Sequence, residues 1–89
     1  MKAAVLKSLG EPLQVETVPD PSPEAAELVV KVSYCGICGT DLHSTREGAF
    51  AAECDSILGH EFCGHVAEVG SGLKDQWEIG DRVTALPFI

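Results

Sequence analysis

Clustered basic residues and long apolar runs are both missing from these 89 residues. Six Lys and Arg residues stand against fourteen acidic ones, so the formal net charge is -8 and nucleic acid or an anionic membrane is a poor partner. No apolar stretch approaches the ~20 residues that span a bilayer. The start, Met1–Lys7, has an apolar run shorter than the ~7 to 15 residues of a signal peptide core. We therefore expect a soluble, cytoplasmic protein.

Disulfides and a second domain are also not expected. A chain of 89 residues buries roughly 60 to 65% of its unfolded surface, and a hydrophobic fraction of 45% is enough for one small core. Four cysteines without a signal peptide indicate a reducing compartment, where paired thiols more often bind metal or do chemistry. Residues 1–89 are therefore predicted to form a single domain.

Short β-type segments dominate the chain. Strands are predicted where apolar residues alternate between Gly and Pro turns, at residues 1–7, 13–18, 27–34, 62–69 and 81–88. The first two predict a hairpin, and three prolines within 19–23 predict an extended connector. One short helical segment is expected within 35–43 and a loop over 44–56. Many short strands favour a mainly β fold, a small barrel or sandwich.

The chemistry-bearing side chains gather in two short segments, Cys35–His43 and Gly59–Glu61. Within the first, Cys35 and Cys38 form a C-x-x-C pair, which is typical of thiol oxidoreductases. That motif belongs at a strand-to-helix junction of a βαβ unit, and no helix of the required length is expected here. A redox role is therefore disfavoured.

A zinc site explains these segments better. A structural site would need four ligands in two close pairs, whereas Cys54 and Cys63 stand nine residues apart. A catalytic site needs three protein ligands and an open position for water or substrate. Cys38 and His60 offer a thiolate and an imidazole, which are both good zinc donors. The residue types thus favour an open, catalytic zinc site.

The order of several motifs resembles a known family. Four segments of the sequence are Cys38-Gly39-Thr40-Asp41-Leu42-His43, Gly59-His60-Glu61-Phe62, Val69-Gly70 and Gly80-Asp81-Arg82-Val83. In this order they look like the start of the zinc-containing medium-chain alcohol and polyol dehydrogenases. The similarity runs in order along nearly the whole chain. In that family this region is a GroES-like, partly open β-barrel, and a Rossmann domain that binds NAD or NADP follows it. The resemblance implies hydride transfer between an alcohol or polyol and NAD(P), in a protein that is usually a homo-oligomer.

The resemblance also assigns residues to the metal. It makes Cys38 and His60 zinc ligands, and it places Glu61 where some members bring a glutamate close to the metal or into its ligand set. Asp41 matches the carboxylate that orients the histidine ligand, a role that fixes the imidazole tautomer. Cys35 matches no ligand position.

Two further residues match the proton path of the family. Thr40 matches the hydroxyl that contacts the substrate oxygen, and His43 matches the outer end of a proton relay. Taken alone, Thr40 and Asp41 could simply cap the next helical turn.

Parts of the family's machinery are not found within these residues. The third zinc ligand and a four-cysteine second zinc site lie downstream of the quoted motifs in the family. No Gly-x-Gly-x-x-Gly follows a strand, so no dinucleotide site is predicted. We expect residues 1–89 to belong to a longer protein and to be inactive alone.

Two other functions compete with this prediction. A stand-alone GroES-like metal-binding or interaction module would need no proton path, so Thr40 and His43 beside Cys38 favour the enzyme. A zinc-free quinone reductase of the same fold would lack the ligands Cys38 and His60.

The remaining cysteines and one histidine are predicted to have no chemical role. Cys35, Cys54 and Cys63 are expected to be small buried hydrophobes or unpaired loop thiols. His65 is expected to be a solvated surface histidine.

Overall fold

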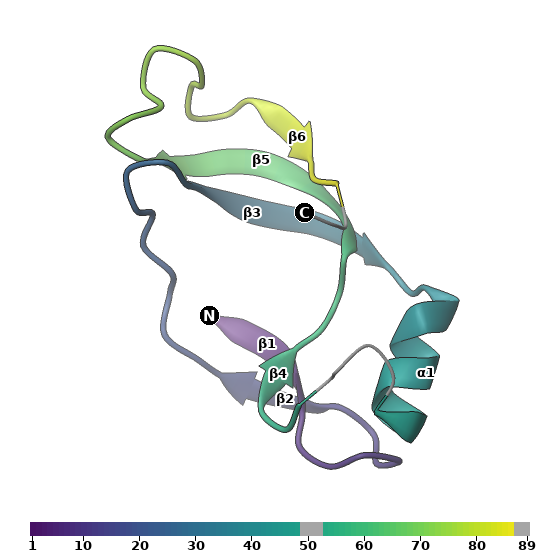
Figure 1. Ribbon diagram of the computed structural model, residues 1–89. Coiled ribbons are helices and arrows are strands. Elements are labelled where there is room, and N and C mark those ends of the chain that lie inside the picture. Colours follow the sequence, from purple (N-terminus) through teal and green to yellow (C-terminus); the bar gives the residue numbers. More distant parts are fainter. Residues whose placement is uncertain (49–52, 87–89) are drawn as a thin grey trace. The chain divides into compact units, whose positions relative to one another are not determined.

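The computed structural model describes residues 1–48 and 53–86, and its contacts divide the chain into two compact units. The first unit comprises residues 1–20 and 37–59, and the second comprises residues 21–36 and 60–89. Each unit holds one three-stranded antiparallel sheet (Figure 1).

The sheet of the first unit has the strand order β2-β1-β4. β1 (Lys2–Leu6) pairs with β2 (Gln14–Thr17) on one side and with β4 (Ser56–Ile57) on the other. This confirms the hairpin predicted from the two alternating segments and the turn between them. Among the described residues of this unit, Val5 and Leu6 are the buried hydrophobic side chains, 2% and 0% exposed.

The helix α1 (Gly39–Glu47) also belongs to the first unit. It ends at Gly48, whose φ of 70° is left-handed, a conformation that glycine adopts without a Cβ clash. The backbone N–H of Gly10 donates to the carbonyl of Thr45 at 2.6 Å, which ties the hairpin turn to the helix. The loop predicted from residue 44 was therefore wrong at its start, because the helix continues to Glu47.

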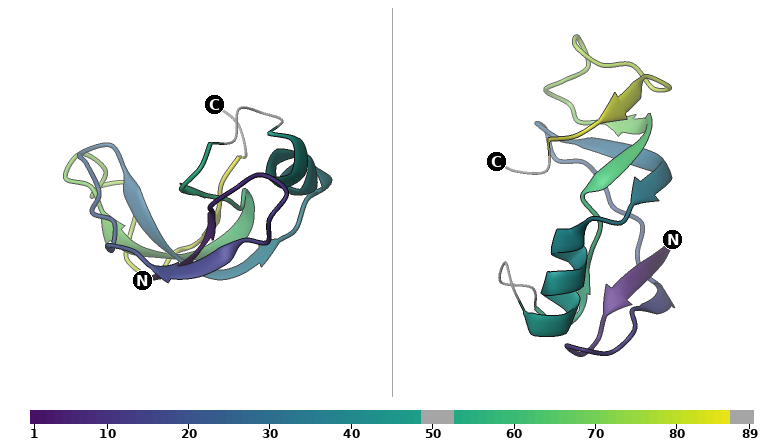
Figure 2. Two further views of the ribbon diagram at one scale, coloured as in Figure 1. Left: turned by 90° about the horizontal axis from the view of Figure 1, so that it is seen from below. Right: turned by 90° about the vertical axis from the view of Figure 1, so that its right-hand side faces the viewer.

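The sheet of the second unit has the strand order β3-β5-β6 (Figure 2). It is built from β3 (Leu28–Gly36), β5 (Glu61–Val69) and β6 (Arg82–Thr84). Val66 on the central strand is completely buried and is the core residue of this unit. The strand predicted over 81–88 is shorter than expected, since β6 ends at Thr84, and residues 87–88 lie outside the described part of the chain.

A bulge in β3 decides which side chains share a face of this sheet. The register moves from the pair Val32–Gly64 to the pair Tyr34–Cys63, which leaves Ser33 as the extra residue. One extra residue shifts the alternation of side chains by one position. Tyr34 therefore lies on the same face as Lys31, although the two are an odd number of positions, three, apart in sequence.

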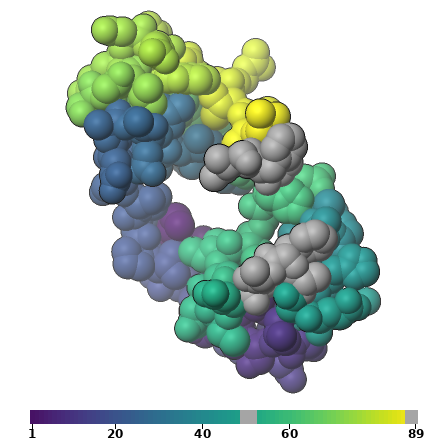
Figure 3. All heavy atoms as spheres, in the orientation of Figure 1, coloured from purple at the N-terminus to yellow at the C-terminus, as the bar shows by residue number. Residues whose placement is uncertain are grey.

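The turn between β5 and β6 packs on the segment that precedes β3, and Figure 3 shows their atoms in contact. The N–H of Gly70 donates to Glu27 O and the N–H of Gly72 donates to Ala25 O, both at 2.8 Å. At Gly70 a Cβ would overlap the carbonyl oxygen of Glu24, so this close approach requires glycine.

The described residues confirm a mainly β fold with one short helix. Within them, no helix has the length and apolar character needed to cross a membrane.

Candidate metal centre

Cys38 lies directly before the first residue of α1 and has an extended backbone, with φ -97° and ψ 152°. Asp41 fixes this position. Its Oδ2 accepts the N–H of Cys38 at 3.0 Å, and its own N–H donates to the carbonyl of Cys38 at 3.0 Å. Reciprocal bonds of this kind satisfy donors that the first helical turn leaves free. The half-buried Cys38 thiol is thus carried by a well-defined helix start.

Glu61 is the first residue of β5, and His60 directly precedes it in the second unit. His60 Nε2 and Glu61 Oε2 are 3.8 Å apart, and the two side chains are 34% and 50% exposed. Glu61 pairs in register with Gly36, the last residue of β3. An imidazole and a carboxylate are therefore held next to each other at one end of the β3–β5 ladder.

Chain connectivity relates Cys38 to this end of the ladder. Cys38 follows Gly36 by two residues, and His60 precedes Glu61 by one. Since one residue spans at most ~3.6 Å, the Cα of Cys38 lies within about 7 Å of the Cα of Gly36. The register of β3 with β5 therefore places Gly36 beside Glu61, although they are more than twenty residues apart in sequence.

Thr40 and His43 both lie on α1. Residues three apart are neighbours on one face of a helix, so the two predicted members of the proton path lie beside each other. The side chain of His43 is 63% exposed, and its Nδ1 is 3.8 Å from Glu47 Oε2. An exposed histidine has direct access to solvent protons.

The other cysteines are free and exposed. The prediction that they could be small buried hydrophobes was therefore wrong. Cys54 lies in a loop, as predicted, whereas Cys35 and Cys63 lie on β3 and β5. The Cys35 thiol has only a 3.7 Å contact with the carbonyl of Gly36.

His65 is half-buried at the middle of the second sheet. Its register partners are Lys31 on β3 and Arg82 on β6. Sequence reasoning treated His65 as an isolated surface histidine and missed this grouping. The alternation within one strand carries no information about which residues pair across strands.

Residues 24–88 match the alcohol dehydrogenase GroES-like domain family. The chain belongs to this family. It is 44% identical over 92 residues to a sorbitol dehydrogenase of Bacillus subtilis, covering 100% of this chain and 26% of that protein. It is 48% identical over 82 residues to alcohol dehydrogenase 2 of Caenorhabditis elegans, covering 90% of this chain and 23% of that protein.

The solved structures agree with these relatives. A dehydrogenase structure from Sinorhizobium meliloti 1021 with NADP bound matches with a TM-score of 0.81 and 44% identity, over 91% of this chain and 23% of that one. The GroES-like domain described here thus spans about a quarter of the length of the proteins it matches. The family and fold predicted from the motifs are confirmed.

Proposed function

We propose that this GroES-like domain carries the zinc site of an NAD(P)-dependent oxidoreductase that transfers hydride between an alcohol or polyol and the nicotinamide. The observation that carries the proposal is the donor chemistry of three residues. Cys38, His60 and Glu61 offer a thiolate sulfur, an imidazole nitrogen and a carboxylate oxygen. The relatives named sorbitol dehydrogenase and alcohol dehydrogenase support the substrate class.

These residues fit zinc by the chemistry of their donors, since thiolate, imidazole and carboxylate are its usual protein ligands. When bound, zinc supplies Lewis acidity toward an alcohol oxygen. Asp41 has two proposed roles. It holds the backbone of Cys38 through the 3.0 Å bond from the Cys38 N–H, and it orients the imidazole of His60.

Thr40 and His43 are proposed to remove the alcohol proton. The Thr40 hydroxyl accepts a hydrogen bond from the alcohol, and the His43 imidazole passes the proton to solvent. The 63% exposure of His43 suits the outer end of such a path. A positioned acid–base group typically contributes ~10² to 10⁴ in rate, which is roughly 3 to 5 kcal/mol of the barrier.

NAD or NADP is proposed to bind outside residues 1–89, because these residues contain no Gly-x-Gly-x-x-Gly after a strand. The NADP in the Sinorhizobium meliloti structure supports a nicotinamide cofactor for the whole protein. We propose further that the whole protein acts in the cytoplasm as a homo-oligomer.

Two matched cysteine variants of the full protein test this function. Cys38→Ala removes a proposed ligand, whereas Cys54→Ala removes an exposed loop thiol. We expect Cys38→Ala to lose one equivalent of zinc and also the reduction of NAD(P) by sorbitol or a secondary alcohol. Cys54→Ala should keep both. Undiminished turnover in Cys38→Ala would rule out the zinc mechanism, and zinc binding by the unaltered protein without any turnover would identify a metal-binding module.

A further inference from the structure

One face of the β3-β5-β6 sheet carries a row of three basic side chains. His65 on β5 is paired with Lys31 on β3 and with Arg82 on β6. Directly opposed residues in antiparallel strands point to the same face, so the three side chains lie side by side across the sheet. Neighbouring strands are about 4.8 Å apart, which places both cations within reach of a group bound over His65.

The cations of this row are not neutralised by the protein. Within the described residues, neither Lys31 nor Arg82 forms an ion pair, and neither they nor His65 form a side-chain hydrogen bond. Lys7 differs, because its ammonium contacts both Asp55 and Glu16. Within the described residues, Lys2 and Lys74 also form no ion pair, so Lys31 and Arg82 are distinguished by their position beside His65.

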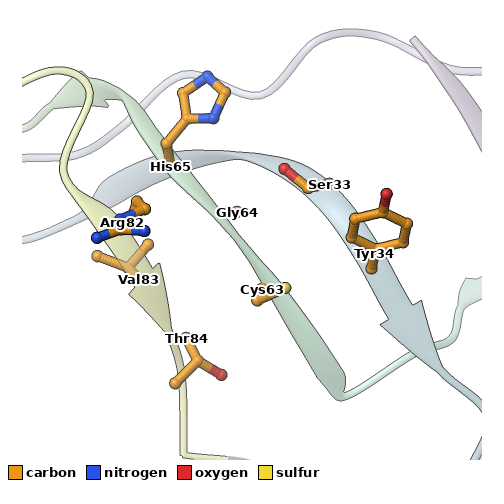
Figure 4. Close-up of a pocket in the computed structure, with 8 residues that line it drawn as sticks. All are labelled: Ser33, Tyr34, Cys63, Gly64, His65, Arg82, Val83 and Thr84. Atoms are coloured by element: carbon orange, nitrogen blue, oxygen red, sulfur yellow. The ribbon is translucent and has the colours of Figure 1, made fainter.

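A hollow of about 690 Å³ adjoins the basic row (Figure 4). The next row across the same face is Tyr34–Cys63–Thr84, and these residues line the hollow with His65 and Arg82. The volume falls in the ~300 to 1,000 Å³ range of small-molecule sites and exceeds that of a single inorganic ion.

The side chains around the hollow suit an oxyanion. An arginine guanidinium donates a fork of two hydrogen bonds to phosphate. Lys31 does not line the hollow, but it pairs in register with His65 and adds a point charge beside it. His65 has an N–H to donate in either protonation state. The hydroxyl of Tyr34, a residue that is 79% exposed, makes no hydrogen bond within the described residues and can donate to a ligand. Its ring offers an apolar surface to an organic group.

Acidic residues do not block this position. Glu61 shares the face, but it lies four residues from His65 along β5, which is about 13 Å by strand spacing. Asp81 precedes Arg82, and its carboxylate accepts the N–H of Glu78 at 3.0 Å. The charged residues directly beside His65 in the register are therefore Lys31 and Arg82.

We propose that this face, defined by Lys31, His65, Arg82 and Tyr34, binds a phosphate group. The group is either inorganic phosphate or the phosphate ester of a small organic molecule. The site uses none of the residues proposed for zinc or for proton transfer.

Phosphorus-31 NMR titration of the full protein tests the proposal, with inorganic phosphate and glycerol 3-phosphate used separately. We expect saturable line broadening that Arg82→Gln and Lys31→Gln each weaken by about 10-fold, because each removes a charged hydrogen bond. Arg82→Lys keeps the charge and loses the fork, so it should give an intermediate loss. Tighter binding of glycerol 3-phosphate would identify an ester site, and equal binding would identify an inorganic phosphate site.

Two control variants separate this site from other causes of phosphate binding. Lys74→Gln removes a cation from the turn between β5 and β6, and it should leave binding unchanged. Cys38→Ala should also leave it unchanged, even where it removes zinc. Non-saturable broadening, an equal loss in Lys74→Gln, or loss of binding in Cys38→Ala would each overturn the proposal.

Discussion

At Gly64, in the centre of β5, the close approach of β3 leaves no room for a side chain. A Cβ at this position would overlap the carbonyl oxygen of Lys31 and lie 2.9 Å from its carbonyl carbon. The clash is with backbone, so it can be relieved only by moving β3 away from β5. We expect Gly64→Ala to lower the free energy of unfolding by about 1 to 3 kcal/mol in chemical denaturation.

Gly39 provides the matched control for this substitution. Nothing lies within 4 Å of a Cβ built at Gly39, the first residue of α1. Gly39→Ala should leave the unfolding free energy unchanged or raise it by up to about 1 kcal/mol, since alanine favours helix. Equal destabilisation by the two substitutions would contradict the packing described for Gly64.

Lys7 gives a prediction about pH. Hydrogen bonds from its ammonium to Asp55, at 2.7 Å, and to Glu16, at 3.1 Å, raise the pKa of Lys7 above 10.5. A raised pKa in the folded state means that the charged form stabilises the fold. This stabilisation is fully present at pH values below the pKa of Lys7 in the unfolded chain. It is lost as the pH rises above about 10.5, through the pKa of Lys7 in the folded chain.

The pKa of Lys7 can be followed by carbon-13 NMR of its side chain. Asp55→Asn should lower this pKa, because it removes the largest cause of the shift. Added salt should lower it as well, since the pair is exposed to solvent. A pKa that did not change in Asp55→Asn would show that the contact is not formed in solution.

The residues of the proposed metal site were largely predictable, whereas those of the phosphate site were not. Cys38 and His60 are recognisable because a short motif surrounds each of them in the sequence. Lys31 and Arg82 carry no motif and are separated by fifty residues. They meet only through the register of three strands, which local sequence does not encode.

At the scale of elements, the start of α1 depends on one carboxylate. Asp41 accepts the N–H of Cys38 and places a negative charge at the helix N-terminus, which together are worth roughly 0.5 to 2 kcal/mol. Asp41→Ala should speed amide hydrogen exchange at Cys38 and in the first turn, and Asp41→Asn should have a smaller effect. Glu47→Gln, at the other end of the helix, is the control. Unchanged exchange in Asp41→Ala would mean that the cap is not formed.

The sequence predicts the interior of each helix and strand better than it predicts where the element begins and ends. Alternation and turn residues predicted five of the six strands, and the segment expected to contain the helix overlaps α1 only from Gly39 to His43. The helix end depends on Gly48 in its left-handed conformation, and the short strand β4 exists only because Ser56 and Ile57 pair with β1. The helix end is a local feature, since the N–H of Gly48 donates to the carbonyl of Ser44, whereas β4 depends on a long-range pairing that local propensity does not encode.

At the scale of the whole molecule, the two units have small buried cores. Val5 and Leu6 are buried in one unit and Val66 in the other, while Tyr34, Ile37, Ile79 and Leu86 are each more than 70% exposed. Family membership was predictable at this scale because the motifs occur in a fixed order along the chain. The proposed substrate and nicotinamide cofactor draw their support from relatives about four times as long as these 89 residues.

The central claim is that Cys38 is a metal ligand, and cobalt substitution in the full protein tests it most directly. Cobalt bound to a thiolate gives a charge-transfer absorption, so the spectrum reports the sulfur ligand without any turnover. Cys35→Ser provides a control from the same C-x-x-C segment, and its exposed thiol is not a proposed ligand. We predict that Cys38→Ser loses one metal equivalent and the corresponding part of this absorption, whereas Cys35→Ser keeps both. A Cys38→Ser protein with the full metal content and absorption would contradict the account.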